Sequence, residues 1–533
     1  MPYDSPIQSK SERRILCIYP RYLPSFSTFH HSYHLMPGIK AFMTPLGLLQ
    51  IAAYLPSKWE IRLIDENMHL ATDADYEWAD AILITGMHAQ RKQVDAINTR
   101  AHSFGKLTVL GGPSVSRCPE YYPDLDIIHM GELGDATDKL IEYIDNSVER
   151  PADQIRLQTI ERLPIENFPI PAYSLLNLRE YFVTSVQSSS GCPHQCEFCD
   201  VPGLYGRAPR SKQPDQVIAE LNAIMDHGGR GPIYFIDDDF IANPKAALNL
   251  LSSLVEWQHR NGHKIEFICE ATISLAQHTD ILDLMREAGF MMVFCGIESP
   301  DPNTLKAIHK EHNLRRPIIE SIRTINSYGI EVSAGIIFGF DTDTPETSEA
   351  VVQFVRESQI PLLTINLLYA LPNTPLYYRL KEEGRLVEDP NRGSNIAFSL
   401  PYETVLGGWR KCLHEIYSPH NLLKRFLYQT VHTYPNRLSE RKPTLADLVM
   451  GTRLLGGILW KIGCRSNYRG EFWKVIGPLL RSGRIEDVLH IGFVGHHLIN
   501  FARGCVSGEA EPCFYGDPNR SAFNSSYSRN LNR

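Results

Sequence analysis

Three cysteines, Cys192, Cys196 and Cys199, have a C-x3-C-x2-C spacing within SSSGCPHQCEFCD. Thiolates this close on one loop can bind one face of an iron–sulfur cluster. A four-iron cluster held by three cysteines keeps one iron open to a substrate or a cofactor, whereas an electron-transfer cluster normally has a fourth cysteine. A structural zinc site is the weaker alternative, because zinc takes four ligands, usually in two pairs, and only His194 lies nearby as a fourth.

The region that carries this triplet, residues 181–392, reads as six strand-then-helix units. The expected strands cover residues 181–187, 231–237, 264–270, 290–298, 329–340 and 361–371. A complete barrel of this type has eight units, so we expect a partial (β/α)6 TIM-type barrel. The triplet follows the first strand, at the carboxyl end where such barrels bind their ligands.

The residues before this region predict a separate domain. Between residues 14 and 144, five short stretches rich in β-branched residues alternate with helical stretches. This alternation predicts a parallel sheet with crossover helices, in a Rossmann or flavodoxin-like α/β domain over residues 1–146. Residues 147–180 contain four prolines and no clear periodicity, so we expect a linker there.

The C-terminal part differs from the rest in charge and in pattern. Residues 401–533 have a net charge of +8 and residues 1–400 a net charge of −16, which indicates distinct domains. Residues 393–506 have mostly helical spacing, and the polar stretch 507–533 predicts a disordered tail. Trp460 and Trp473 stand next to lysines in basic amphipathic helices. Such helices lie on an anionic membrane surface, or they pack on the barrel as a cap.

Composition excludes several classes of protein. Hydrophobic residues make up 43% and charged residues 21%, as in an ordinary globular chain. Eleven cysteines in 533 residues are too sparse for a disulfide-stapled scaffold. No stretch reaches the ~18 apolar residues of a membrane span, and the polar N-terminus has no signal-peptide core. We therefore expect the chain in the cytoplasm. Without a dense Lys/Arg run or a recognised module, we expect no nucleic-acid partner.

With Phe198 just before its third cysteine, and with a six-unit barrel behind it, the triplet resembles that of the radical S-adenosylmethionine (SAM) superfamily. The resemblance covers about residues 180–385. It implies a [4Fe–4S] cluster on the three cysteines and SAM on the open iron, cleaved to a 5′-deoxyadenosyl radical. It also implies SAM contacts from Phe198, Asp238, Glu298 and Gly335. Asp238 has helix capping as its alternative role, and Gly335 has close strand packing. The superfamily's usual Gly-Gly-Glu run is not evident.

The first domain resembles the cobalamin-binding domain of a radical SAM subclass. The resemblance is carried by LGGPSVS (110–116) and TPLGLLQIAAYL (44–55). It implies cobalamin contacts from Gly111, Gly112 and Ser114, for which a plain turn is the alternative. The D-x-H-x-x-G segment that supplies a lower cobalt ligand in mutases is absent. His69 has the wrong spacing, and His88 is better explained as a loop histidine, so we expect no histidine below the cobalt.

A nucleotide-binding flavodoxin-like module is the other interpretation of this domain. It would need a phosphate loop after the first strand, and the chain has RYLPSFSTFHHSYH (21–34) there instead. This aromatic, histidine-rich loop either covers a flat macrocycle or an apolar substrate, or it is a disordered insert.

The resemblance implies a cobalamin-dependent radical SAM methyltransferase, in particular the bacterial members that methylate hopanoids at C-2. It implies a polycyclic lipid substrate such as diploptene, methylcobalamin as methyl donor, and a ferredoxin or flavodoxin as reductant. A peripheral contact with the inner face of the membrane would bring the chain to such a lipid. The alternatives are a radical cyclase or methylase that acts on a tetrapyrrole, a peptide or an antibiotic, and a non-enzymatic cobalamin or iron–sulfur sensor. The sequence identifies no catalytic side chain.

Overall fold

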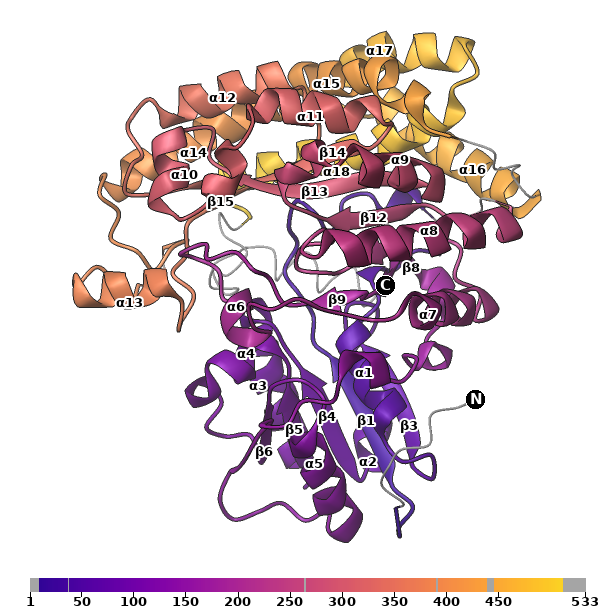
Figure 1. Cartoon of the computed structure of the whole chain (residues 1–533), viewed down its shortest axis with the longest axis vertical. Coiled ribbons are helices and arrows are strands. Elements are labelled where there is room, and N and C mark those ends of the chain that lie inside the picture. Colours follow the sequence, from indigo (N-terminus) through magenta and orange to yellow (C-terminus); the bar gives the residue numbers. More distant parts are fainter. Residues whose placement is uncertain (1–8, 37, 263–264, 390–391, 439–444, 511–533) are drawn as a thin grey trace.

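The structure, a computed structural model, describes residues 9–36, 38–262, 265–389, 392–438 and 445–510. Two parallel sheets dominate it, one in the N-terminal part and one in the middle of the chain, and C-terminal helices pack beside the second sheet (Figure 1). The last helix ends at Ser507, where the tail was predicted to begin. Residues 511–533 of this predicted tail lie outside the described residues.

The first sheet has six parallel strands in the order β3-β1-β4-β5-β6-β7. They are β1 (Arg14–Tyr19), β3 (Glu60–Asp65), β4 (Ala81–Thr85), β5 (Leu107–Gly111), β6 (Ile127–Met130) and β7 (Ile155–Gln158). Helices α1 (Leu46–Tyr54) and α5 (Asp135–Asn146) cover one face, and α2 (Asp73–Trp78) and α3 (Arg91–Ser103) cover the other. From β1 the sheet extends to one side with β3 and to the other side with β4 and the strands that follow it. This is the flavodoxin-like strand order, so the predicted fold of this domain is confirmed.

One strand of this sheet lies where the sequence predicted a linker. β7 falls within residues 147–180 and pairs with β6, with Ile155 opposite Ile127. The stretch predicted as a linker thus contributes a strand to the first sheet at Ile155–Gln158. This edge strand is only four residues long and the stretch around it is rich in proline, so it leaves little periodicity to detect.

The second sheet has seven parallel strands in the order β15-β14-β13-β12-β11-β8-β2. Six come from the predicted units: β8 (Tyr181–Val186), β11 (Ile233–Phe235), β12 (Phe267–Glu270), β13 (Phe290–Glu298), β14 (Glu331–Phe338) and β15 (Leu363–Leu367). The helices of these units are α7 (Pro214–Asp226), α8 (Pro244–Asn261), α9 (Thr279–Ala288), α11 (Ile318–Ser327), α12 (Thr347–Ser358) and α13 (Pro375–Glu382). The partial six-unit barrel is confirmed.

The seventh strand, β2 (Ala41–Met43), comes from the N-terminal part of the chain and pairs with β8. Part of the segment that leads to it, residues 20–36, leaves the end of β1 and packs on the C-terminal helices. The Phe26 ring lies 4.7 Å from that of Phe501, and the Phe29 ring lies 5.7 Å from that of Phe493. The aromatic loop is thus an ordered connection between all three parts of the chain, not an insert without structure.

The C-terminal part is helical, as predicted. It consists of α14 (Tyr402–Ile416), α15 (Pro419–His432), α16 (Leu445–Ile458), the π-helix η10 (Leu459–Cys464), α17 (Arg469–Arg481) and α18 (Ile485–Ser507). Trp409 of α14 donates a hydrogen bond to the Ile365 carbonyl, at 2.9 Å, so α14 covers the edge strand β15. The buried apolar side chains of these helices belong to the same core as the barrel. No helix among the described residues is both long and apolar enough to cross a membrane.

Candidate active site at the cysteine loop

The cysteine loop begins after β8 and the short strand β9 (Ser189–Ser190). It is closed by the antiparallel pairing of β9 with β10 (Arg210–Ser211). Gly191 just before the first cysteine has φ of +96°, and a Cβ there would lie 3.0 Å from the Gly206 carbonyl. Only glycine makes this turn without strain, so the sequence SGCP positions Cys192 at the start of the loop.

The three thiols are half-buried and act on one another electrostatically. Burial raises the pKa of Cys192 to about 11 and that of Cys199 to about 12, and the neighbouring thiols of the triplet raise both further. Within the described part of the chain, no three His, Cys, Asp or Glu side chains are placed to hold one metal ion. Thiolates of a cluster each bind a different iron, so they stand farther apart than the ligands of a single ion. The donor set therefore fits a cluster better than zinc.

The acidic run after β11 holds this loop in place. Asp238 accepts a hydrogen bond from the Gly191 amide at 2.8 Å, and the buried Asp237 accepts from the Ser188 and Ser189 amides, each at 2.7 Å. Burial raises the pKa of Asp237 and of Asp238 to about 6. The capping alternative for Asp238 was wrong, because Asn243 caps α8 by accepting from the Ala246 amide.

Glu298 ends β13 with φ of +66°, and its carboxylate lies 2.6 Å from the buried ammonium of Lys310. Two glycines make room for this carboxylate. A Cβ at Gly296 would lie 2.4 Å from its Oε1, and one at Gly335, which is paired with Gly296 on the neighbouring strand, would lie 3.7 Å from its Oε2. The predicted residues Glu298 and Gly335 are thus neighbours. The sequence did not indicate Lys310, which follows a helical turn and has no motif around it.

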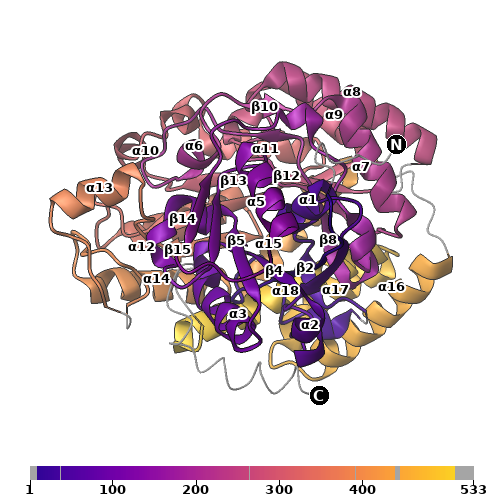
Figure 2. The same cartoon turned by 90° about the horizontal axis from the view of Figure 1, so that it is seen from below.

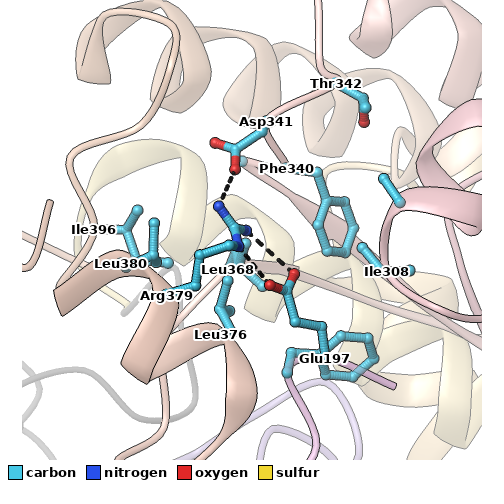
Figure 3. Close-up of a pocket in the computed structure, with 13 residues that line it drawn as sticks. Glu197, Ile308, Phe340, Asp341, Thr342, Leu368, Leu376, Arg379, Leu380 and Ile396 are labelled. Atoms are coloured by element: carbon cyan, nitrogen blue, oxygen red, sulfur yellow. Dashed lines mark hydrogen bonds and ion pairs between the residues drawn. The ribbon is translucent and has the colours of Figure 1, made fainter. Parts of the chain in front are cut away.

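Phe198, the residue before the third cysteine, borders a small cavity, which Figure 3 shows with Glu197 and Arg379 in its lining. Its ring lies 6.3 Å from that of Phe340, just beyond β14, and Lys310 lies 5.9 Å above its centre. The cavity also contains Arg379 of α13, which bonds to Glu197 between the second and third cysteines and to Asp341. The sequence did not identify Arg379, because only the fold brings α13 to the cysteine loop.

Glu270 is a further acid near the carboxyl end of the barrel, at the end of β12. Tyr234 of β11 donates a hydrogen bond to it at 2.7 Å. The pKa of Glu270 is raised to about 7, mainly by burial; the hydrogen bond from Tyr234 opposes this rise, and the charges of Asp238 and Asp237 add to it. The carboxyl group therefore titrates near neutral pH. The only sequence signal for it was its position at the end of a predicted strand.

In the first domain, the predicted glycine loop follows β5 and lies close to the end of β4. Gly111 ends β5, and Gly112 has φ of +101°. A Cβ on Gly112 would lie 2.6 Å from the Thr85 hydroxyl oxygen. Ser114 is buried, with its hydroxyl 3.0 Å from Nδ1 of His88 and 2.6 Å from the Tyr122 hydroxyl. The backbone of this loop is free of bulky side chains at the carboxyl edge, where such sheets bind ligands.

The two histidines considered as cobalt ligands have different surroundings. His69 is exposed and follows β3. Burial lowers the pKa of His88 to about 4, and the charges of Arg117 and Arg91 lower it too, so its imidazole is neutral at physiological pH. The contact with Ser114 orients one of its ring nitrogens.

The carboxyl end of the first sheet lies against the cysteine loop. Glu132, after β6, lies 2.6 Å from Arg210 of β10 and accepts a hydrogen bond from Ser190 of β9 at 3.1 Å. Arg117 of α4 (Pro113–Arg117) and Asn373, before α13, exchange two hydrogen bonds. Both views place the first domain at the loop side of the barrel (Figures 1 and 2). The glycine loop and the cysteine triplet thus belong to facing edges.

Comparisons with known proteins agree with this arrangement. Residues 186–355 match the family model described as the radical SAM superfamily, and residues 374–511 match one described as a domain of unknown function, DUF4070. The hopanoid C-2 methylase of Rhodopseudomonas palustris (strain TIE-1) is 53% identical over 95% of this chain and 97% of its own length. An uncharacterised methyltransferase of Synechocystis sp. (strain ATCC 27184 / PCC 6803 / Kazusa) is 34% identical over 88% of both chains.

Among solved structures, the cobalamin-dependent SAM radical enzyme OxsB, with aqua-cobalamin and SAM bound, superposes with a TM-score of 0.58. The alignment covers 94% of this chain and 84% of that chain at 16% identity, which establishes a shared fold. Membership of the radical SAM superfamily carries with it the [4Fe–4S] cluster and SAM. The identity of more than half over nearly the whole length of both chains shows that this protein belongs to the hopanoid C-2 methylase family of radical SAM enzymes.

Proposed function

We propose that the protein is a cobalamin-dependent radical SAM methyltransferase that methylates C-2 of a hopanoid such as diploptene. The observation that carries this proposal is the 53% identity to a hopanoid C-2 methylase over almost the whole chain. The facing positions of the glycine loop and the cysteine loop support it. A methyl donor on the first sheet and a radical source on the barrel would then be close to one substrate.

In this proposal the cofactors supply the difficult chemistry: cluster and SAM generate a carbon radical, and methylcobalamin supplies the methyl group. The protein provides attachment and orientation. Cys192, Cys196 and Cys199 would hold the cluster, and Asp237 and Asp238 fix the loop through its amides. Other residues would bind the two organic cofactors: Phe198, Glu298 and Gly335 for SAM, and Gly111, Gly112 and Ser114 for cobalamin.

Deletion of the gene, followed by mass spectrometry of the membrane lipids, tests this function in cells. We expect 2-methylhopanoids to disappear and the unmethylated hopanoid, lighter by one CH2 group, to accumulate. Complementation with the natural gene should restore the methylated lipid, and a variant with Cys192, Cys196 and Cys199 all replaced by alanine should not. A lipid profile unchanged by the deletion would contradict the proposal.

We propose that the chain reaches this lipid from the membrane surface, through a basic aromatic face. This face comprises the exposed residues Met450, Arg453, Trp460, Arg465, Trp473 and Lys474 on α16, η10 and α17. Trp460 is 56% and Trp473 40% exposed, unusual values for tryptophan. Residues 449–481 contain six Lys or Arg and one acid, Glu471. Exposed tryptophan among cations favours the interface of an anionic bilayer.

For the one-electron donor we propose a ferredoxin or a flavodoxin. Exposed cations near the cysteine loop support this proposal, because they would attract the acidic surface of such a donor. Lys306 and Arg315 are exposed on the segment whose Ile308 carbonyl accepts the Glu197 amide at 3.1 Å, and Arg207 is exposed in the loop itself. A donor that binds there would be next to the cluster.

A further inference from the structure

Arg425 of α15 is a buried cation without an acidic partner in the described part of the chain. Its side chain is almost fully buried, with the residue only 4% exposed. Nε donates to the Ile360 carbonyl and Nη1 to the Ile416 carbonyl, each at 2.8 Å. Nη2 has no hydrogen-bond partner among these residues. An unpaired buried charge costs several kcal/mol, so the site favours an anion that the protein itself does not provide.

Arg425 lines a cavity of about 150 Å³ between α12, α14 and α15. The other polar residues of its lining are Arg356, Gln359, Glu415, Asn421 and Lys424, over apolar walls from α12 and α14. Glu415 is already paired with Arg356. Lys424 and Arg425 therefore remain as two positive charges without a carboxylate partner in the described structure, and the space is sufficient for a tetrahedral anion.

The cavity is separate from the radical site. Gln359, in its lining, follows α12, and Ile360 precedes β15, so the cavity lies at the amino ends of the strands. The cysteine loop lies at the opposite, carboxyl ends. Nothing in the methyl transfer proposed above requires an anion here, and the inference stands whether or not the substrate is a hopanoid.

Two exposed apolar side chains, Leu427 and Val431, extend from this cavity along the outer surface of α15. Lys424, Leu427 and Val431 follow one another at spacings of three and four residues, which places them on one side of the helix. Leu427 is 38% and Val431 61% exposed. A charged pocket beside an exposed apolar stripe suits a molecule with an anionic head and a hydrocarbon body.

We propose that the cavity around Arg425 and Lys424 binds a phosphate group, supplied by a phospholipid headgroup or by free phosphate. Two cations with free hydrogen-bond donors match the negatively charged oxygens of a phosphate group, and arginine and lysine are the usual residues at such sites. The competing explanation is that water fills the cavity, and that Arg425 only caps the last carbonyl of α14 at Ile416.

Isothermal titration of the full-length, cluster-reconstituted protein with inorganic phosphate, at constant ionic strength in chloride, tests this proposal. We expect one saturable site. Lys424→Met should weaken binding at least tenfold, and Arg425→Met should abolish it. Lys411→Met is the matched control, because Lys411 is an exposed lysine of α14 that pairs with Glu349 away from the cavity. It should bind phosphate as the natural protein does.

Circular dichroism shows whether the Arg425→Met variant folds. If it does not fold, the Lys424→Met variant still tests the proposal, because Lys424 is exposed and its replacement should leave the fold intact. A short-chain phosphatidic acid and the matched diacylglycerol then separate the two sources. Tighter binding of the phosphatidic acid, weakened in Leu427→Ser/Val431→Ser, identifies a lipid headgroup site. Binding of phosphate that acyl chains do not improve identifies a free-phosphate site. No saturable binding of either ligand, or binding equal in Lys424→Met and Lys411→Met, would overturn the proposal.

Discussion

Arg379 bonds to both carboxylate oxygens of Glu197, at 2.5 and 3.1 Å, although 182 positions separate them in the chain. The same guanidinium lies 2.9 Å from Asp341, after β14 (Figure 3). Glu197 is also fixed through its backbone, since its amide donates to Ile308 and its carbonyl accepts from Leu376. The residue between two of the cluster cysteines is therefore held from three directions.

We predict that Arg379→Met lowers the iron content after anaerobic reconstitution and lowers the thermal unfolding midpoint. The two charge-assisted hydrogen bonds to Glu197 are lost, together with one each to Asp341 and Glu383. Such bonds contribute about 1.5–3 kcal/mol each when both partners are well ordered, and less here because Arg379 is partly exposed. Arg385→Met is the matched control, because Arg385 bonds to Asp341 and Glu383 but not to Glu197. Its iron content should stay at the level of the natural protein.

Cysteine variants serve as the negative and positive controls for this measurement of iron content. Replacement of Cys192, Cys196 and Cys199 together by alanine should leave no bound cluster, whereas Cys17→Ala and Cys118→Ala, in the first domain, should leave it intact. A triple variant that retained four irons would show that the triplet is not the cluster site. Equal iron in Arg379→Met and Arg385→Met would show that the contact with Glu197 does not support the loop.

The half-buried carboxyl of Glu270 predicts a dependence of stability on pH. Its pKa is raised to about 7 from an ordinary value of 4.5. As pH rises between these values, the unfolded chain releases the proton and the folded one keeps it, so folding stability falls and then levels off above pH 7. Glu270→Gln should therefore unfold at a higher temperature than the natural protein at pH 8, by the equivalent of about 1–3 kcal/mol at ~1.4 kcal/mol per pKa unit.

At pH 5 the same substitution should change the midpoint little, because both proteins then carry a neutral group. Glu266→Gln, four residues earlier in the chain and exposed, is the matched control and should have no pH-dependent effect. Differential scanning calorimetry of the three proteins at the two pH values decides the matter. A stabilisation by Glu270→Gln that was the same at pH 5 and pH 8 would contradict the raised pKa.

Cobalamin should bind without a histidine below the cobalt. His69 is exposed on a loop, and His88 is oriented by Ser114. In electron paramagnetic resonance of the cob(II)alamin form, we expect no superhyperfine splitting from an axial nitrogen, in the natural protein and in His69→Ala and His88→Ala alike. A splitting that one of these variants removed would identify the lower ligand and contradict the prediction.

The basic aromatic face should bind anionic membranes. We expect the protein to co-sediment with vesicles that contain phosphatidylglycerol at low salt, and less at high salt, because each basic residue near the surface contributes about 1 kcal/mol that salt screens. Trp460→Ser/Trp473→Ser should reduce this binding severalfold. Leu70→Ser, an exposed leucine of the first domain, is the control and should not.

Point variants are the better test here than removal of residues 401–533. The helices of that region share a core with the barrel, and the Trp409 indole bonds to β15, so their loss would expose the barrel's interior. Vesicle binding that was equal in the double tryptophan variant and in Leu70→Ser would leave these helices as a structural cap alone.

The sequence predicted what short-range patterns encode. The strand–helix alternation gave both sheets, and the cysteine spacing located the candidate cluster site, because each depends on residues close together in the chain. Four short strands were not predicted. β2 and β7 are edge strands of three and four residues, and β9 and β10 have two residues each, so all four are too short to show a periodic pattern.

The missed site residues share one physical cause: each depends on a partner that only the fold brings into contact with it. Lys310 is meaningful only beside Glu298, and Arg379 only beside Glu197, and no local pattern distinguishes either from a surface cation. For Asp238 the motif pointed to the right place and left its role open. The structure gives it a bond to Gly191, which positions the loop that carries the cysteines.

The central claim, transfer of a methyl group to C-2 of a hopanoid, is tested most directly with isotope-labelled cofactor. The reconstituted protein, with cobalamin, a reductant and diploptene, would be given SAM carrying a trideuterated methyl group. Our account predicts a product with an intact CD3 group at C-2, formed together with 5′-deoxyadenosine. Formation of 5′-deoxyadenosine while no labelled methyl group enters the hopanoid would contradict it.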